Sequence, residues 1–214
     1  MTYLEIVNKV LRLLREDEVD TVQVTDDVVV AIVADFVNDA KRLVEDAHDW
    51  NPLRTTWVET LTPENQYVSL TNSGKSARIE YIRSADKPLR ESTNAQLENL
   101  QLRSSESSSP IYYAVSGLDA SNDLRLRLYP TPDTAETITV TGFRKQDDLS
   151  ADADVLLVPA QPVVYYALAF AARERGEVGG QTAAEVFAMA KQFLNNAISY
   201  DAALNQLEYD WYTV

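Results

Sequence analysis

Hydrophobic residues recur at helical spacing at both ends of this chain, whereas they alternate with polar residues through its middle. Near the N-terminus, one helical stripe carries Leu4, Val7, Leu11 and Leu14. Thr2 and Glu5 have the spacing of a capping box, in which each side chain accepts a hydrogen bond from the other residue's backbone. The pattern therefore predicts a first helix that starts after Thr2 and buries one broad face.

A second helical stripe runs from Val29 to Ala47 and predicts a helix capped by Thr25 or Asp26. Its opening, VVVAIV, is rich in β-branched residues, which favour strands. The stripe nevertheless continues for about five turns, whereas a typical strand has only about six residues. Pro52 closes this segment, because the residue before a proline disfavours the helical conformation.

From Arg54 the period of the pattern changes to two, which predicts strands separated by turn residues. Strand patterns start near Thr56, Tyr67, Ala77, Ile111, Leu124 and Thr137. Between the third and fourth of them, STNAQLENLQLR can form a short helix capped by Ser92 or Thr93. Five or six strands predict a small antiparallel sheet or barrel.

The pattern then returns to helical spacing. A helix is predicted from about Gln161 to Glu174, with Pro162 in its first turn and Gly176 just beyond its end. It has almost no polar side, so we expect it to be buried all round, either in the core or at a subunit interface. The residues concerned are Tyr165, Tyr166, Leu168 and Phe170. A fourth helix, from about Gln181 to Leu204, is expected to pack antiparallel to it.

Together these elements predict an α+β fold in which the N- and C-terminal helix pairs form a four-helix bundle and the strands form one inserted antiparallel β domain. The expected domains are residues 1–52 for the first half of the bundle, 53–154 for the β-rich insertion, and 155–214 for the second half with a C-terminal arm. The 214 residues are 45% hydrophobic, which is sufficient for a sizeable core.

Composition narrows the possible functions. The chain has 33 acidic and 19 basic residues and a formal charge of -14, which argues against binding to duplex DNA through its phosphates. It contains no cysteine, so disulfides, thiolate metal sites and cysteine nucleophiles are excluded. No apolar run approaches the roughly 20 residues that a membrane-spanning helix needs. We therefore expect a soluble protein that is made in a cytosol and has no membrane partner.

Enzymatic motifs are sparse. His48 is the only histidine, and it lies near Glu45, Asp46 and Asp49 at the end of the second helix. A hydrolytic or metal site there is disfavoured, because carboxylates at helix ends commonly stay exposed and no second histidine or cysteine can complete a zinc shell. Gly179 and Gly180 are not part of a phosphate-binding loop. We predict no catalytic, metal-binding or cofactor-binding residues, although paired carboxylates of a glycosidase type cannot be recognised from sequence.

A family resemblance rests on three segments, FVNDAKRLVEDAHDWNPLR before the strands, LRLYPTPDTAETITVTGFRK within them and YYALAFAARERGE after them. With the order of helix pair, β insertion and helix pair, they resemble the head-to-tail adaptor proteins of tailed bacteriophages, also called head completion or tail tubular proteins. The resemblance extends from about Thr2 to Tyr200. It consists of packing and turn patterns rather than chemical signatures.

This resemblance implies a non-enzymatic structural protein of the virion, located in the neck between capsid and tail and made in the host cytoplasm. Identical subunits, usually twelve, form a homo-oligomeric ring beneath the portal protein, and the ring receives tail or nozzle proteins. DNA passes through the lumen during ejection without specific binding. The C-terminal segment of such proteins commonly reaches along the portal. No cofactor is implied.

The composition of the C-terminal segment NQLEYDWYTV indicates a partner-binding role independently of the family resemblance. Aromatic and aliphatic anchors are enriched in the cores of protein interfaces, and this segment offers Leu207, Tyr209, Trp211 and Tyr212. The alternative is that it folds back on its own helices. The acidic excess likewise has two interpretations, a ring lumen that repels phosphate or simple solubility.

Two other functions remain as alternatives to the connector. A muralytic tail protein, which hydrolyses cell wall, would need only two well-placed carboxylates. A tail module that binds glycans or a receptor would use exposed aromatic residues such as Trp57.

Overall fold

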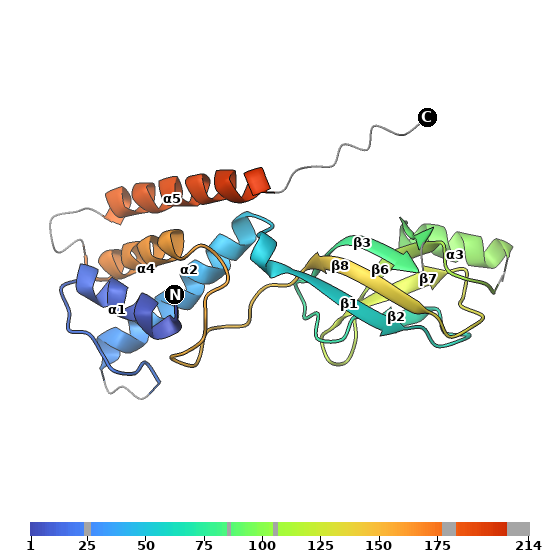
Figure 1. Cartoon of the computed structure of the whole chain (residues 1–214), viewed down its shortest axis with the longest axis horizontal. Coiled ribbons are helices and arrows are strands. Elements are labelled where there is room, and N and C mark those ends of the chain that lie inside the picture. Colours follow the sequence, from blue (N-terminus) through green and yellow to red (C-terminus); the bar gives the residue numbers. More distant parts are fainter. Residues whose placement is uncertain (24–26, 85–86, 105–106, 177–182, 205–214) are drawn as a thin grey trace. The chain divides into compact units, whose positions relative to one another are not determined.

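The structure is a computed structural model that describes residues 1–23, 27–84, 87–104, 107–176 and 183–204 (Figure 1). The chain divides into two compact units, one of Met1–Leu53 with Gln146–Val214 and one of Arg54–Lys145. They are called the helical unit and the β unit below.

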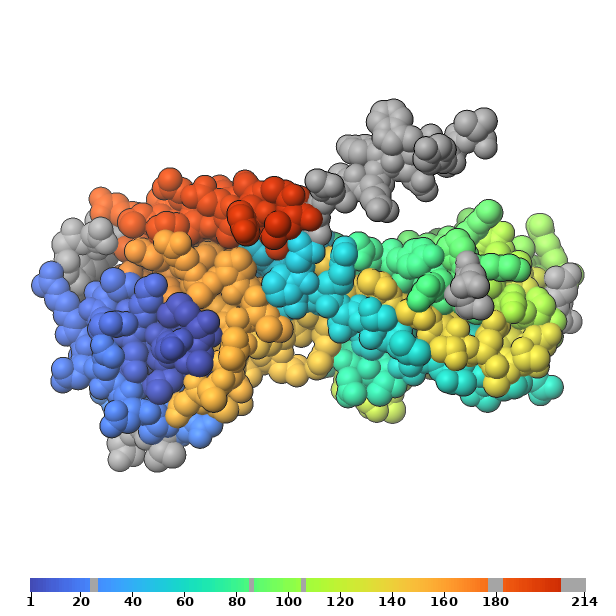
Figure 2. All heavy atoms as spheres, in the orientation of Figure 1, coloured from blue at the N-terminus to red at the C-terminus, as the bar shows by residue number. Residues whose placement is uncertain are grey.

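The helical unit is organised around one apolar helix. It contains α1 (Tyr3–Leu13), α2 (Val28–Ala47), a short 3-10 helix (Asn51–Leu53), α4 (Ala160–Glu174) and α5 (Ala183–Leu204). Helix α4 contacts α1, α2 and α5, and its atoms are visible between those of α1 and α5 in Figure 2. Val163, Val164 and Ala167 of α4 have no exposed surface. This helix is therefore the common partner of the other three long helices of the unit.

Local capping explains where the helices start and end. The capping box predicted for the first helix is confirmed: Thr2 Oγ1 accepts from Glu5 N at 3.3 Å, and Glu5 Oε2 accepts from Thr2 N at 2.9 Å. The N-cap of α2 is Asp27, whose Oδ1 accepts from Val29 N at 2.8 Å, and not Thr25 or Asp26, which lie outside the described residues. Gly176 follows α4 with a φ of 70°, as expected for a helix-ending glycine.

The segment that returns from the β unit, residues 146–159, is held by α1 and α2. Leu149 exchanges two hydrogen bonds with the side-chain amide of Asn38, at 2.9 and 3.1 Å. Tyr3 N donates to Asp154 O at 2.8 Å, and Asp152 accepts from Thr21 Oγ1 at 2.6 Å. Two backbone N–H groups that donate to the Asp154 carboxylate lower its pKa. This segment thus reaches α4 along a defined path.

A buried ion pair fixes the start of the same segment. The Nζ atom of Lys41 lies 3.2 Å from Glu45 Oε1 one turn further along α2, and Lys41 is fully buried. Lys41 also donates to the carbonyl of Gln146 at 2.7 Å, while Glu45 accepts from the Gln146 N–H at 3.3 Å. The two buried charges therefore neutralise each other, and both also form hydrogen bonds with the backbone of Gln146.

The β unit has two four-stranded sheets. The first has the order β1 (Arg54–Thr60), β8 (Thr137–Phe143), β3 (Arg78–Ser84), β4 (Lys87–Pro88), and all its pairs are antiparallel. The second has the order β2 (Tyr67–Ser69), β7 (Leu124–Tyr129), β6 (Tyr112–Leu118), β5 (Arg90–Glu91), and its β5–β6 pair is parallel. Helix α3 (Asn94–Arg103) packs on β6 and β7.

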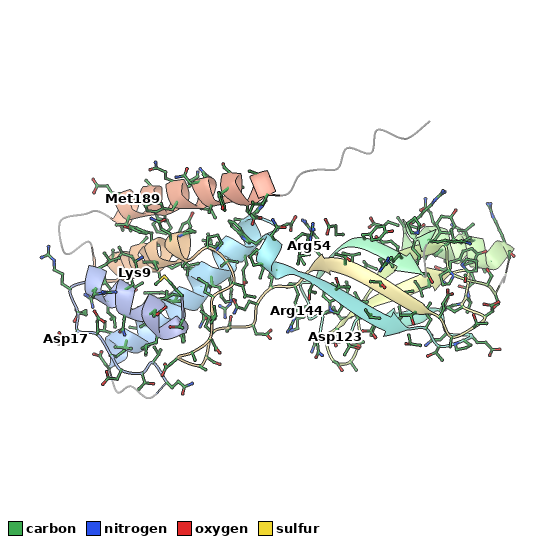
Figure 3. The ribbon with its side chains drawn as sticks, viewed as in Figure 1. Lys9, Asp17, Arg54, Asp123, Arg144 and Met189 are labelled. Atoms are coloured by element: carbon green, nitrogen blue, oxygen red, sulfur yellow. The ribbon has the colours of Figure 1, made fainter. Side chains whose placement is uncertain are left out.

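Residues from both sheets share one hydrophobic core, which includes Trp57, Ile82, Leu126, Leu128 and Val140. The first sheet is closely packed at Gly142, where a Cβ atom would lie 2.2 Å from the carbonyl oxygen of Arg78. Glycine is required there because the two backbones approach too closely for any side chain. Figure 3 labels Arg54 and Arg144, where the chain enters and leaves the unit, and Asp123 in the loop before β7.

The predicted fold class is wrong in its particulars, although the fold is α+β. The described residues contain five α-helices and two four-stranded sheets, with strands distributed from residue 54 to residue 143, instead of a four-helix bundle with one inserted antiparallel β domain. The physical reason is that alternation and turn residues locate strands without specifying their partners. Neither the second sheet nor the parallel pairing of the very short β5 has a signal in the pattern.

The Lys41–Glu45 pair leads to a stability prediction. We expect Lys41→Met to lower the free energy of unfolding by about 3–5 kcal/mol, because it leaves a buried carboxylate without its cation. The double variant Lys41→Met/Glu45→Met should lose clearly less than the sum of the two single changes. Denaturant unfolding of the four proteins measures this coupling.

Arg42, the next residue of the same helix, is the matched control, because it pairs with Asp39 on that helix and with Asp148 of the returning segment while its side chain remains 51% exposed. Arg42→Ala should cost no more than about 1 kcal/mol. If the changes at positions 41 and 42 lowered the free energy of unfolding equally, the Lys41–Glu45 pair would not be the stabilising contact. Strictly additive losses at positions 41 and 45 would also contradict the coupling of these two residues.

Candidate partner-binding surface

The predicted anchors of the C-terminal arm, Leu207, Tyr209, Trp211 and Tyr212, lie outside the described residues. Their role as partner-binding residues stays a prediction. The four residues of α4 that were predicted to lie in the core or at a subunit interface can be placed.

Tyr166 and Leu168 are buried, and Tyr165 and Phe170 are partly exposed. The ring of Tyr165 lies 4.7 Å from that of Phe193 on α5, and the ring of Phe170 lies 5.6 Å from that of Phe187. Burial raises the pKa of the Tyr166 hydroxyl above its ordinary value. All four therefore pack within their own unit. A subunit contact would use the exposed parts of Tyr165 and Phe170.

The carboxylates near His48 lie in different environments. Glu45 is buried in its pair with Lys41, contrary to the expectation that helix-end carboxylates are exposed, whereas Asp46 is exposed. His48 instead lies with its Nε2 atom 3.1 Å from Asp201 Oδ2 on α5. Within the described part of the chain, no group of three histidine, aspartate or glutamate side chains could hold a metal ion.

Asp201 connects the end of α5 to the segment that follows α2. Its Oδ2 atom also accepts from the backbone N–H of Asn51 at 3.3 Å, and Asp201 itself is buried. The His48 ring meets the Trp50 ring edge-on at 5.0 Å. Sequence reasoning missed this contact because residues 48 and 201 are far apart in the chain and no local pattern relates them.

An apolar cavity of about 640 Å³ lies beside this contact, within the helical unit. It is lined by residues from the segment after α2, the start of α4 and the C-terminal half of α5: Trp50, Pro52, Leu157, Val158, Pro159, Gln161, Pro162, Phe193, Asn196, Ala197, Tyr200, Asp201 and Leu204. A volume of this size can accept one or two large side chains of a partner.

The cavity has a rigid floor and an exposed rim. Trp50 is fully buried and its indole N–H donates to the Val44 carbonyl at 2.7 Å, so the ring cannot turn away. Tyr200 and Leu204, which also line the cavity, are 72% and 62% exposed. Apolar, concave surfaces of this kind are where anchor residues of protein partners bind. Residue 205, the first of the C-terminal arm, directly follows a lining residue of the cavity.

The net charge of the chain is confined to the helical unit. Its sequence contains 22 acidic and 8 basic residues, whereas the β unit contains 11 of each. The two units therefore differ in electrostatic character, and only the helical unit would repel a polyanion at long range.

The comparison with known families identifies the class of protein: the family model of the SU10 adaptor protein matches residues 1–212. The chain belongs to the SU10 adaptor protein family, a family of phage head-tail adaptors, which are structural proteins of the virion. The resemblance drawn from the sequence is thereby confirmed.

A search of curated proteins found no match. Among the described residues, no helix is long and apolar enough to cross a membrane.

The Asp201 contact yields a prediction for α5. Asp201→Ala should reduce the free energy of unfolding by about 1–3 kcal/mol, because it leaves the Asn51 N–H and the His48 ring without their acceptor. Asp201→Asn retains an acceptor oxygen and should retain most of the stability. Hydrogen exchange should increase selectively in the C-terminal half of α5.

Ser199→Ala, on an exposed turn of the same helix, is the control and should change stability by no more than about 0.5 kcal/mol. If Asp201→Ala behaves like Ser199→Ala, the contact does not hold the end of α5.

Proposed function

We propose that this protein forms a homo-oligomeric ring, of twelve subunits as in the adaptors it resembles, beneath the portal protein of a tailed phage. The ring joins the capsid to tail or nozzle proteins in the neck of the virion and lets DNA pass without specific binding. The protein is made in the host cytoplasm and acts without enzymatic activity. The observation that carries this proposal is the family match over residues 1–212.

The charge distribution supports a specific orientation of the subunit. A channel for DNA must not adsorb phosphate, and a wall with excess carboxylates keeps the polyanion away from the protein surface. All of the net negative charge belongs to the helical unit, so we assign the wall of the lumen to it. The neutral β unit is then available for tail proteins or for neighbouring subunits.

Attachment to the portal is assigned to the C-terminal arm. The arm follows the exposed end of α5, where Leu204 lines the apolar cavity. Leu207, Tyr209, Trp211 and Tyr212 provide the large, rigid side chains that dominate binding energy in protein interfaces. The acidic subunits repel one another, so the portal is needed to bring them together.

Deletion of Leu207–Val214 tests this assignment. The truncated protein should unfold at the same denaturant concentration as the full chain but should lose binding to purified portal, since single anchor residues typically contribute about 2 kcal/mol or more. Portal binding is measured by co-sedimentation. Complementation of a phage that lacks the gene is scored as DNA-filled heads with tails.

A second variant, with the four anchors changed to serine, tests the anchor side chains separately, because it keeps the length and charge of the arm. It should fail in the same way as the deletion. Normal assembly of either variant would contradict the anchor role. Loss of the folded state would show that the arm belongs to the core of the helical unit. Release of peptidoglycan fragments by the purified protein would instead favour a muralytic function.

A further inference from the structure

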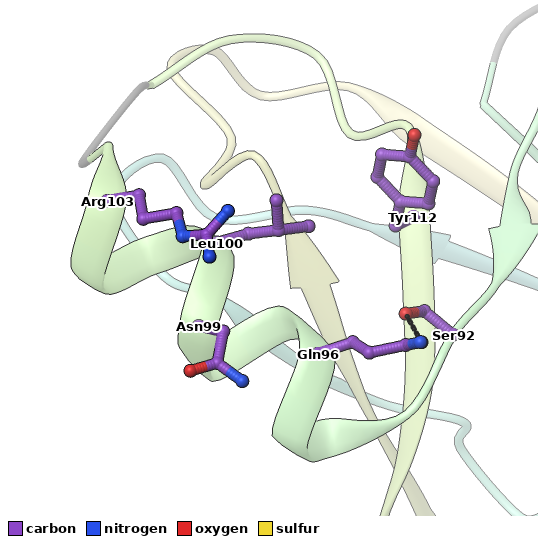
Figure 4. A pocket seen from close by; sticks show the side chains of 6 residues that line it. All are labelled: Ser92, Gln96, Asn99, Leu100, Arg103 and Tyr112. Carbon is purple, nitrogen blue, oxygen red and sulfur yellow. Dashed lines mark hydrogen bonds between the residues drawn. The ribbon is translucent and has the colours of Figure 1, made fainter.

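The β unit contains a second concave site, which none of the functions above uses. A pocket of about 420 Å³ is lined by Ser92, Gln96, Asn99, Leu100, Arg103 and Tyr112. Gln96, Asn99 and Arg103 are spaced by three and four residues and therefore share one face of α3. Figure 4 shows them on successive turns of the helix, with Tyr112 on the neighbouring strand β6.

The pocket is held in shape by contacts beneath it. Thr93 caps α3 in a capping box with Gln96, and Leu97 is only 1% exposed. Asn94 Nδ2 donates to the Val115 carbonyl at 2.7 Å, and Tyr129 Oη donates to the Ser104 carbonyl at 3.2 Å. Both ends of the helix are thus fixed to the second sheet. The polar side chains on its outer face are presented by a rigid element, as binding sites require.

The hydrogen bonds inside the pocket leave mainly donors for a ligand. Gln96 Oε1 already accepts from Ser92 Oγ at 3.0 Å and from Thr93 N at 3.4 Å, so the amide NH₂ of Gln96 remains to donate. The side chains of Asn99, Arg103 and Tyr112 have no hydrogen-bond or ion-pair partner in the described part of the chain. Their amide, guanidinium and hydroxyl groups can all donate.

The charge of the pocket specifies the ligand further. Among the described residues that line the pocket, Arg103 is the only charged one, and none carries a carboxylate. A guanidinium presents two parallel N–H donors that match the two oxygens of a carboxylate. A nucleic acid backbone would require several cations along a groove, which a single arginine does not provide. A neutral sugar could use the amide oxygen of Asn99 as an acceptor, but it would leave the positive charge of Arg103 without a counter-charge.

We propose that this pocket binds a side-chain carboxylate presented by an acidic segment of a partner protein. Arg103 forms the bidentate ion pair, Asn99 and Gln96 donate through their amide NH₂ groups, and Leu100 with the ring of Tyr112 contacts the aliphatic part of the bound side chain. That the partner is a protein rests on the proposed adaptor function. The chemistry of the site rests on the pocket alone.

The test is a titration of the isotope-labelled full chain with the peptide acetyl-Gly-Glu-Glu-Gly-amide in low-salt buffer, followed by nuclear magnetic resonance. We expect saturable shifts confined to the backbone amides of α3, Ser92 and Tyr112 and to the Arg103 side chain. The matched peptide with glutamine in place of glutamate should bind at least about tenfold more weakly, because hydrogen bonds to a charged group are the stronger ones. Added salt should weaken binding of the glutamate peptide but not of the glutamine peptide.

Two variants distinguish the pocket from general electrostatics. Arg103→Leu should weaken binding of the glutamate peptide by about tenfold or more. Arg83→Leu, which removes the same charge from an exposed position on β3 in the other sheet, should leave binding unchanged. Equal effects of the two variants, or equal binding of the glutamate and glutamine peptides, would overturn the proposal.

Glucuronic acid is titrated in parallel, since a uronic acid also carries a carboxylate. Tighter binding of the sugar than of the peptide would overturn the assignment of a protein ligand. Because the titration uses the isolated chain, its result is independent of ring formation. If the protein assembled on the portal but did not bind the peptide, only the proposal for the pocket would be refuted. If it bound the peptide but did not assemble on the portal, only the adaptor proposal would be refuted.

Discussion

The helical unit depends on the burial of α4. Its apolar residues cover almost the whole circumference of the helix, so it is stable only when other elements surround it. Helices α1 and α2 supply part of that surface from the N-terminal side of the chain, and α5 supplies the rest. Since α4 follows the entire β unit in the sequence, the unit cannot close until the chain has returned from Lys145.

This constraint explains why the returning segment is held so firmly. Lys41 and Glu45 bind both backbone groups of Gln146, and Asn38 does the same for Leu149 a few residues later. These contacts align the chain before it reaches α4. A buried ion pair is costly to desolvate, and its retention is reasonable where it specifies the path of the chain rather than adding stability.

The chain divides its surface chemistry between its two units, with the net charge and the apolar cavity on the helical unit and the donor-rich pocket on the neutral β unit. Such a division is compatible with the proposed connector, which would pass DNA at one surface and bind proteins at others. In this account the cavity beside Trp50 and the pocket beside Arg103 serve different contacts. Each is formed entirely within one unit, so neither requires a particular arrangement of the two.

Local chemistry in the sequence predicted the elements better than their arrangement. The Thr2–Glu5 capping box, the early Pro162 and the late Gly176 indicate helix ends that the structure contains, because such signals act within a few residues. The sheet order was not predictable, since alternation does not identify a strand's partner. The buried state of Glu45 and the Asp201–His48 contact were missed because both depend on tertiary packing between distant parts of the chain.

The mass of the protein in solution, alone and with its portal, tests the central claim most directly. Native mass spectrometry of the isolated chain should give a species near its monomer mass of 24.0 kDa or a weak oligomer. Addition of portal should give a complex whose extra mass corresponds to one ring of identical subunits, twelve for the adaptors it resembles. A tight ring without portal would contradict the requirement for the portal, and no mass gain with the portal would contradict the adaptor assignment itself.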